Sequence, residues 1–190
     1  MPKVGMEPIR RKQLIEATIQ VVADVGLQST TISLIGKQAG LSSGIISHYF
    51  GGKQGLIEAT VRYLLGELRI DDAPKDPLER LLKIVDINFS HVQSARSATK
   101  TWLSFWAQSQ HDESLFRLQE VNKRRLVSNL RHSFRQLLPK ADVAAAAEST
   151  AAMIDGFWIR CALANADADK FEQAKEHCKR YIRQLLKNHS

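Results

Sequence analysis

Gly40 separates two short segments whose apolar residues recur with the period of an α-helix. The first segment runs from Thr30 or Thr31, either of which can cap a helix, to about Ala39, and the second begins at Ser42. Two short helices joined by a glycine-containing turn have the spacing of a DNA-binding helix-turn-helix. The same spacing also fits a plain helical hairpin inside a bundle, in which the serines act only as caps. The pattern favours DNA binding over that alternative.

The second segment has two chemically different faces. Its apolar residues Leu41, Ile46 and Tyr49 are expected to pack inward against the first helix of the chain. Lys53 begins the helix that follows, where an ammonium group beside exposed backbone N–H groups can hold a phosphate. The outward face carries short residues that can reach phosphates and base edges, namely Ser42, Ser43, Gly44, Ser47 and His48.

The charge distribution around this segment supports a polyanionic partner. The chain carries a net charge of +7 and has a pI near 9.6. No acidic residue occurs between Asp24 and Glu58, a window that contains Lys37 and Lys53. Nothing in this window would therefore repel a phosphate group.

Helical periodicity extends along nearly the whole chain, and no alternating strand pattern competes with it. A first helix at about 8–25 is followed by Gly26, which can cap its C-terminus. Asp71–Pro77, with two prolines and three aspartates, forms a linker. Further helices are expected at about 53–68, 78–92, 96–110, 114–137, 142–165 and 168–188. The chain is predicted to be all-α, with an N-terminal three-helix helix-turn-helix domain at 8–68 and a C-terminal helical domain at 78–190.

Several blocks in the N-terminal part resemble the tetracycline-repressor (TetR) family of bacterial regulators over about residues 8–68, with the motif at about 31–50. These blocks are Thr31-Ile32, Ala39-Gly40-Leu41-Ser42, Ser47-His48-Tyr49-Phe50, Lys53 and Leu56. The resemblance implies phosphate contacts from Thr31, Ser42, Ser43, Tyr49 and Lys53, and base-facing positions at Gly44, Ser47 and His48. Gly36 departs from the family, which usually has alanine there, and Gly51-Gly52 stands where a charged or capping residue is frequent.

The C-terminal part contains residue types suited to a quaternary ammonium ion. Such a cation has no N–H to donate, so a protein holds it with aromatic faces and a nearby negative charge. Trp102, Phe105 and Trp106 share one helix face, and Asp155 stands in a stretch otherwise apolar enough to be buried. An aromatic stripe at helical spacing also fits ordinary core packing, and both interpretations stay open. The candidate ligand residues are Phe89, Trp102, Phe105, Trp106, Asp155 and Trp158.

Longer blocks are similar to the choline-responsive members of that family, which repress glycine betaine synthesis. They are Gly44 to Phe50, Trp102 to Ala107, Arg124 to Leu130 and Ile154 to Trp158. The resemblance implies a DNA-binding repressor of choline-to-glycine-betaine (osmoprotectant) genes that choline releases or modulates. One alternative is a repressor of the same fold that responds to another cationic or apolar small molecule. A second is a helical protein-interaction module without an operator.

The last two helices predict a homodimer. The helix around 143–165 is apolar nearly all round and must be covered on every side, which requires a partner. Together with 168–188 it can form a two-fold four-helix interface, as the resemblance implies. The partner DNA is then double-stranded operator with an inverted repeat. The basic run Lys123-Arg124-Arg125, with Arg117, Arg131 and Arg135, is interpreted as a solvated helix face.

Other function classes fit poorly. Ser47 and His48 are adjacent, hence about 100° apart on a helix, so they do not pair as nucleophile and base. Cys161 and Cys178 fit no metal or redox spacing and suit a reducing compartment. The charged N-terminus does not resemble a signal peptide, and no apolar run has the length of a membrane span. We expect no enzyme activity, cofactor, metal or membrane attachment, and a bacterial cytoplasmic, nucleoid-associated location.

Overall fold

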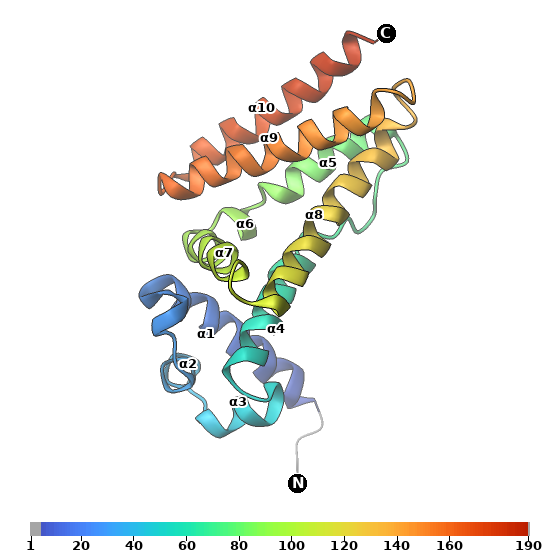
Figure 1. Ribbon diagram of the computed structural model, residues 1–190. Helices are drawn as coiled ribbons and strands as arrows, with labels where there is room; N and C mark the ends of the chain where they lie inside the picture. The colour runs from blue at the N-terminus through green and yellow to red at the C-terminus, as the bar shows by residue number, and fades with distance from the viewer. Residues whose placement is uncertain (1–4, 190) are drawn as a thin grey trace. The chain divides into compact units, whose positions relative to one another are not determined.

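The computed structural model describes residues 5–189, which contain helices and no strand. The all-α fold expected from the sequence is confirmed. The helices are α1 (Met6–Ser29), α2 (Ile32–Ala39), α3 (Ser43–Phe50), α4 (Lys53–Gly66), α5 (Pro77–Asn88), α6 (His91–Ser94), α7 (Arg96–Ser109), α8 (Glu113–Phe134), α9 (Val143–Leu163) and α10 (Ala168–Lys187) (Figure 1).

The chain forms two compact units, each assembled from two stretches of sequence. The first contains Met1–Gly66 and Arg96–Leu118, and the second contains Glu67–Ala95 and Gln119–Ser190. The first unit therefore includes α7 in addition to the four N-terminal helices. The division into domains at 8–68 and 78–190 stays a prediction from the sequence.

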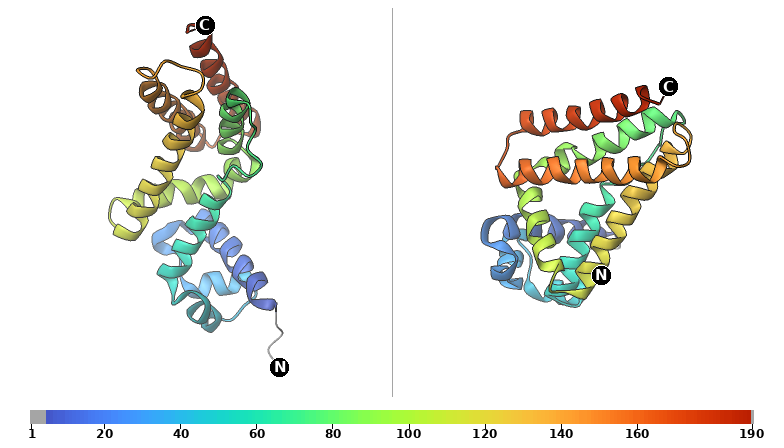
Figure 2. Two further views of the ribbon diagram at one scale, coloured as in Figure 1. Left: turned by 90° about the vertical axis from the view of Figure 1, so that its right-hand side faces the viewer. Right: turned by 45° about the horizontal axis from the view of Figure 1, so that its top comes forward.

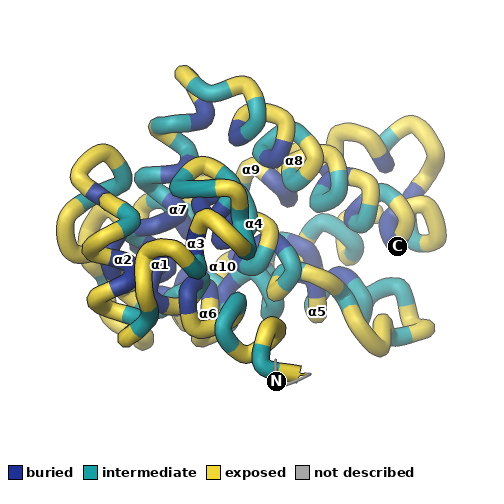
Figure 3. The backbone as a smooth tube through the Cα atoms, turned by 90° about the horizontal axis from the view of Figure 1, so that it is seen from below, coloured by how far each residue is buried: buried dark blue, intermediate teal, exposed yellow. Residues whose placement is uncertain are grey.

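The core of the first unit is built where α1, α2, α3 and α4 meet. Leu14, Ile35, Ile46 and Leu56 contribute one fully buried side chain from each of these helices. The buried and exposed stretches alternate along the backbone of these helices, as amphipathic helices around a shared core require (Figure 3). Helix α7 packs along α1 in the same unit (Figure 1).

Helix α1 departs from the predicted helix in one detail. The regular helix is interrupted at Gly26, whose φ of 78° and ψ of 161° are not helical. A further turn follows up to Ser29, and the Thr30 hydroxyl donates to the Gly26 carbonyl at 2.7 Å. Glycine breaks the helix at the expected place and has a positive φ, a conformation that is open to a residue without a Cβ.

The second unit is a packed set of longer helices. Leu81 of α5, Leu130 of α8, Ile154 of α9 and Ile182 of α10 lie in its interior, each at most 1% exposed. Helix α10 lies beside both α9 and α5 (Figure 1, Figure 2). Helix α10 therefore packs against α9 on one side and α5 on the other.

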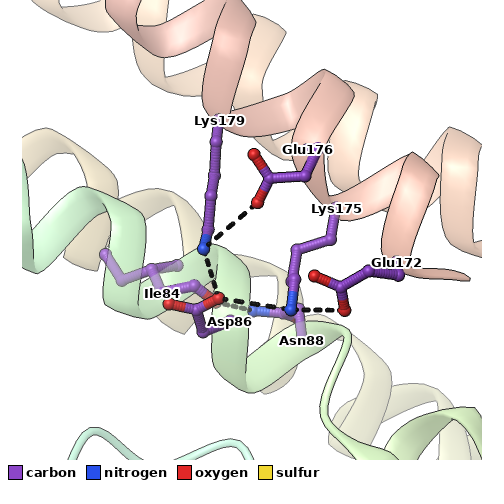
Figure 4. Close-up of polar contacts among 7 residues, drawn as sticks. All are labelled: Ile84, Asp86, Asn88, Glu172, Lys175, Glu176 and Lys179. Carbon is purple, nitrogen blue, oxygen red and sulfur yellow. Dashed lines mark hydrogen bonds and ion pairs between the residues drawn. The ribbon is translucent and has the colours of Figure 1, made fainter.

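A charge cluster joins α10 to α5. The carboxylate of Asp86 lies 2.6 Å from Lys179 Nζ and 3.8 Å from Lys175 Nζ. Glu172 and Glu176 contact the same two lysines from within α10 (Figure 4). Both lysine side chains keep less than a fifth of their surface exposed. Partly buried charges that are paired on both sides hold a helix in a defined orientation.

Candidate nucleic-acid interface and effector site

Helix α3 has the two faces that the sequence predicts. Ile46 is fully buried, and Leu41 and Tyr49 are partly buried against the same core. The opposite face is exposed at Ser42, Ser43, Gly44, Ser47 and His48. None of the described acidic residues lies in α2, α3 or their connection. The exposed face is therefore free of negative charge, although its contact with DNA stays a prediction.

The two candidate caps of the motif behave differently. The Thr31 hydroxyl accepts a hydrogen bond from the Leu34 backbone N–H at 3.2 Å and caps α2, as expected. Ser42 occupies the N-cap position of α3, but its side chain makes no capping hydrogen bond. Ser42 therefore precedes α3 at the expected place but does not cap it through its side chain, and its hydroxyl stays on the exposed face.

Glycine is required where α3 turns into α4. Gly51 (φ 71°) closes α3, and its N–H donates to the Ser47 carbonyl at 3.0 Å. Gly52 has a φ of 123°, a conformation that residues with a side chain rarely adopt. Both residues of the Gly51-Gly52 pair thus form a turn with positive φ, which glycine adopts without a Cβ penalty.

Two other glycines allow close approach of backbones. A Cβ on Gly55 would lie 1.9 Å from the Phe50 carbonyl oxygen, so no side chain fits between α4 and the end of α3. A Cβ on Gly36 would lie 2.9 Å from the Leu41 carbonyl oxygen. The small residue at 36 therefore sits where the turn after α2 passes close to the helix. Gly55 was not singled out from the sequence.

Arg11 is a second residue that sequence reasoning missed. Its Nη1 donates to the Tyr49 carbonyl oxygen at 2.6 Å, and its guanidinium lies 4.4 Å from the centre of the Phe50 ring. A cation at the C-terminus of a helix interacts favourably with the helix dipole. Arg11 therefore fastens the end of α3 to α1 from outside the core.

Lys53 begins α4, where a phosphate-binding role was predicted. Its side chain is half-buried and borders a cavity of about 140 Å³ that Gln108 and Leu115 also line. The next residue, Gln54, donates from Nε2 to Asp112 Oδ2 at 2.8 Å and to Ser114 Oγ at 3.2 Å. The first turn of α4 is thus tied to the connection between α7 and α8.

The candidate effector residues divide between the two units. On α7, the Trp102 ring centre lies 5.6 Å from Phe105 and 5.8 Å from Trp106. Trp102 and Phe105 are buried, and Trp106 is half-buried. The structure therefore brings these three aromatic side chains together within the first unit.

The other three candidates belong to the second unit. Phe89 and Trp158 are buried, and Trp158 packs edge-on against Phe171 of α10 with ring centres 6.3 Å apart. This contact is what ordinary core packing predicts for Trp158. Assembly of all six candidates into one cage stays a prediction.

Asp155 differs from expectation. It is exposed rather than buried, as are its neighbours Ala152 and Gly156 on α9. Nearby protein atoms still displace water and raise the pKa of its carboxyl to about 6, while Lys123 acts in the opposite direction. Water at the exposed carboxylate reduces the rise in its pKa but does not reverse it. A carboxylate whose charged form is disfavoured by neighbouring protein atoms is a suitable partner for a cation.

Metal and membrane sites are not found in the part of the chain that the structure describes. Residues 5–189 contain no group of three or more His, Cys, Asp or Glu side chains placed to hold a metal ion. Within the same range, no helix combines the length and the apolar character that crossing a bilayer requires.

A helix-turn-helix whose exposed α3 face carries no acidic residue, in an otherwise helical chain, is typical of DNA-binding regulators. The chain belongs to the TetR family of bacterial regulatory proteins, whose family model matches residues 14–60. Residues 77–187 match the model for the C-terminal part of the BetI-type transcriptional repressor. Members of this family bind operator DNA, form dimers and bind small-molecule effectors. The protein is thus a transcriptional regulator and not an enzyme.

Individual relatives agree with this assignment. The HTH-type transcriptional regulator BetI 1 of Chromohalobacter salexigens is 47% identical over 192 residues, covering 98% of this chain and 95% of the relative. A putative transcriptional regulator from Pseudomonas aeruginosa PAO1 has the same fold, with a TM-score of 0.77 and 27% identity over 94% of this chain and 91% of its own. A regulator from Saccharomonospora viridis, solved in complex with choline, shares the fold with a TM-score of 0.71 and 20% identity over 93% and 96%.

Proposed function

We propose that this protein represses the genes that convert choline to glycine betaine and that choline releases or modulates this repression. The observation that carries the proposal is the similarity to BetI regulators over nearly the whole chain, with 47% identity in one of them. A structural relative crystallised with choline supports the same effector class.

The proposed DNA contacts lie on the exposed face of α3 and beside it. Gly44, Ser47 and His48 face the bases, and phosphate contacts come from Thr31, Ser42, Ser43, Tyr49 and Lys53. Side chains on this face that donate and accept hydrogen bonds are suited to both roles. The operator is an inverted repeat because a two-fold dimer presents two copies of α3, separated by about 34–36 Å or a multiple of that.

The proposed homodimer forms through α9 and α10. The exposed face of α9 carries small residues at Ala145, Ser149, Ala152 and Gly156, so another helix can approach it closely. The protein acts in the cytoplasm, where its DNA and its effector are both present.

The proposed effector site uses the aromatic side chains of Phe89, Trp102, Phe105, Trp106 and Trp158 with the carboxylate of Asp155. Choline binds one arrangement of the dimer better than the other and shifts the population towards it. Bound choline then changes the protein's affinity for operator DNA by the same factor by which bound operator changes its affinity for choline.

A direct test is titration of choline into the protein bound to a fluorescent operator fragment. We expect operator affinity to change at least tenfold at saturating choline, and Asp155→Asn to remove most of this response while leaving operator binding intact. Tetramethylammonium and an uncharged isostere, 3,3-dimethylbutanol, separate charge recognition from apolar recognition. Unchanged operator binding at millimolar choline contradicts the choline assignment and leaves a TetR-family repressor with a different effector. Absence of any sequence-preferring, salt-dependent DNA binding contradicts the repressor itself.

A further inference from the structure

A basic groove of about 390 Å³ lies between α8 and α9 in the second unit. We call it the α8–α9 groove. All but two of its lining residues come from α8; Arg135 directly follows that helix, and Glu148 lies on α9. The charged and titratable residues that line it are Lys123, Arg124, Arg131, His132, Arg135 and Glu148.

Positive charge exceeds negative charge on the walls of this groove. With histidine neutral, four permanent cations and one carboxylate line it, which gives a local charge of +3. Glu148 is engaged by Arg131, whose Nη2 lies 3.2 Å from Glu148 Oε1. Arg124 also contacts Glu120 on α8, 3.5 Å away, but this pair is open to solvent and contributes little. The excess charge matches an anion that carries more than one negative charge.

Arg131 supplies a donor that the protein does not use. Its Nε is buried, and no acceptor lies within hydrogen-bonding distance of it among residues 5–189. The Nε–H and Nη groups of arginine form a planar fork that matches two oxygens of a carboxylate or phosphate. A small rotation of the guanidinium away from Glu148 would present this fork to an anion in the groove.

The groove is not an evenly solvated helix face. Arg125 follows Lys123 and Arg124 in sequence, yet it is half-buried and lines a separate cavity of about 20 Å³. Arg131 of α8 is only partly exposed and pairs with Glu148 of α9, whereas Lys123, Arg124 and His132 remain exposed to solvent. The volume of the groove is in the range of small-molecule sites, roughly 300–1,000 Å³.

We propose that the α8–α9 groove binds a small multivalent oxyanion, the chemistry shared by phosphate-bearing metabolites and polycarboxylates. The anion proposal does not depend on choline being the effector, although Lys123 in the wall of the groove also acts on Asp155 of the candidate cation site. The ligand of the groove has the opposite charge to the cation of the candidate effector site.

Calorimetric titration of the full-length protein with pyrophosphate, and separately with citrate, tests the proposal at an ionic strength fixed with potassium chloride. We expect one anion per chain. Arg131→Gln combined with Arg135→Gln should weaken binding at least tenfold. Arg135→Gln alone changes an exposed side chain and should weaken binding severalfold, which preserves the test if the double variant does not fold. Glu148→Gln should strengthen binding because it removes the internal competitor for Arg131.

Arg117→Gln is the matched control, because Arg117 is exposed on the same helix, pairs with Glu113 and lies outside the groove. If pyrophosphate binds more tightly than citrate, the ligand is phosphate-bearing. If citrate binds more tightly than pyrophosphate, the ligand is a polycarboxylate. The proposal is overturned if neither anion binds, or if Arg117→Gln weakens binding as much as the double variant does. It is also overturned if only duplex DNA binds the groove, or if the double variant dissociates the dimer in sedimentation without any anion present.

Discussion

Gln54 Nε2 lies 2.8 Å from Asp112 Oδ2, a hydrogen bond that spans 58 residues of sequence within the first unit. The other carboxylate oxygen of Asp112 accepts from Ser114 Oγ at 2.7 Å and from the Leu115 N–H at 3.0 Å, so the same side chain caps α8. The Ser114 hydroxyl first, and then the Leu115 N–H and the Gln54 amide, lower the pKa of Asp112. One carboxylate thus joins the start of α4, immediately after the turn from α3, to the start of α8.

Removing this contact should loosen the attachment of α4. We expect Gln54→Ala to lower the free energy of unfolding by about 0.5–1.5 kcal/mol, the usual net value of a hydrogen bond. Asp112→Ala should cost more because α8 also loses its cap. Chemical denaturation measures both, and the double variant gives the coupling between the two side chains. Gln110→Ala, an exposed neighbour in the same connection, should change stability by less than about 0.5 kcal/mol.

The pH dependence of the Asp112 contribution has a defined sign. Since its folded pKa lies below the ordinary value of 3.8, the stability it contributes is complete above that pH and disappears as the pH falls through the folded pKa. Wild type and Asp112→Asn should therefore differ in unfolding free energy at pH 7 and converge in strong acid. If the difference in unfolding free energy between wild type and Asp112→Asn stays the same at pH 2, ionisation of Asp112 is not its cause.

Gly55→Ala should prevent normal packing of α4 on α3. The added Cβ would lie 1.9 Å from the Phe50 carbonyl oxygen, which belongs to the backbone and cannot rotate away. We expect a loss of at least about 2 kcal/mol in unfolding free energy, at the upper end of overpacking effects. Gly66→Ala is the matched control, because its Cβ would meet nothing within 4 Å. Equal unfolding temperatures for the two variants would contradict the close approach of the two backbones.

His48→Ala and Lys53→Ala should affect DNA binding in different ways. His48 lies on the exposed face of α3, so its loss should alter the preference among operator variants at nearby base pairs. Lys53→Ala should weaken all DNA by a similar factor and reduce the slope of log affinity against log salt by about 1. Fluorescence anisotropy with operator, mutated operator and unrelated DNA at several salt concentrations distinguishes these effects. Identical profiles for the two variants would contradict the assigned roles.

Asp155 should make stability and cation binding depend on pH in opposite directions. Its pKa is raised to about 6 from the ordinary 3.8, so between these values the folded protein holds a proton that the unfolded chain has lost. Its contribution to stability therefore falls as the pH rises from about 4 to about 6. Asp155→Asn should unfold at a higher temperature than wild type at pH 7, and the difference should shrink at pH 4. Choline affinity of the wild type should rise over the same interval, because only the carboxylate attracts the cation.

Asp169→Asn provides the comparison for this experiment, since Asp169 is an exposed carboxylate in the first turn of α10. It should leave the pH profile of choline binding unchanged. A profile for Asp155→Asn that matches wild type would show that another group titrates and that Asp155 is not the counter-ion.

The periodicity of apolar residues predicted most of the helices because each of them covers a core with one face. The expected helix at 96–110 corresponds to α7 at Arg96–Ser109, and the one at 168–188 to α10 at Ala168–Lys187. Helix α6 was missed because its four residues are too short to show a period. In the structure, the backbone hydrogen bonds around His91 define this helix.

The site was less predictable than the fold, for two physical reasons. Arg11 contacts Tyr49 and Phe50 across 38 residues, and no local pattern encodes such a pairing. The exposure of Asp155 was misjudged because hydropathy treats alanine as a core residue, whereas Ala152 and Gly156 are exposed in the single chain. The residue types of a segment predict that it is a helix, but tertiary structure decides which of its residues other helices cover.

The separation of the two faces of α3 has a practical consequence for engineering. Ser43, Ser47 and His48 are exposed, and their side chains make no hydrogen bonds with other described residues. Ile46, Arg11 and the two glycines after α3 hold the helix in place without them. Libraries that randomise only the three exposed positions should yield folded regulators with new operator preferences, so this protein offers a scaffold for programmable gene switches.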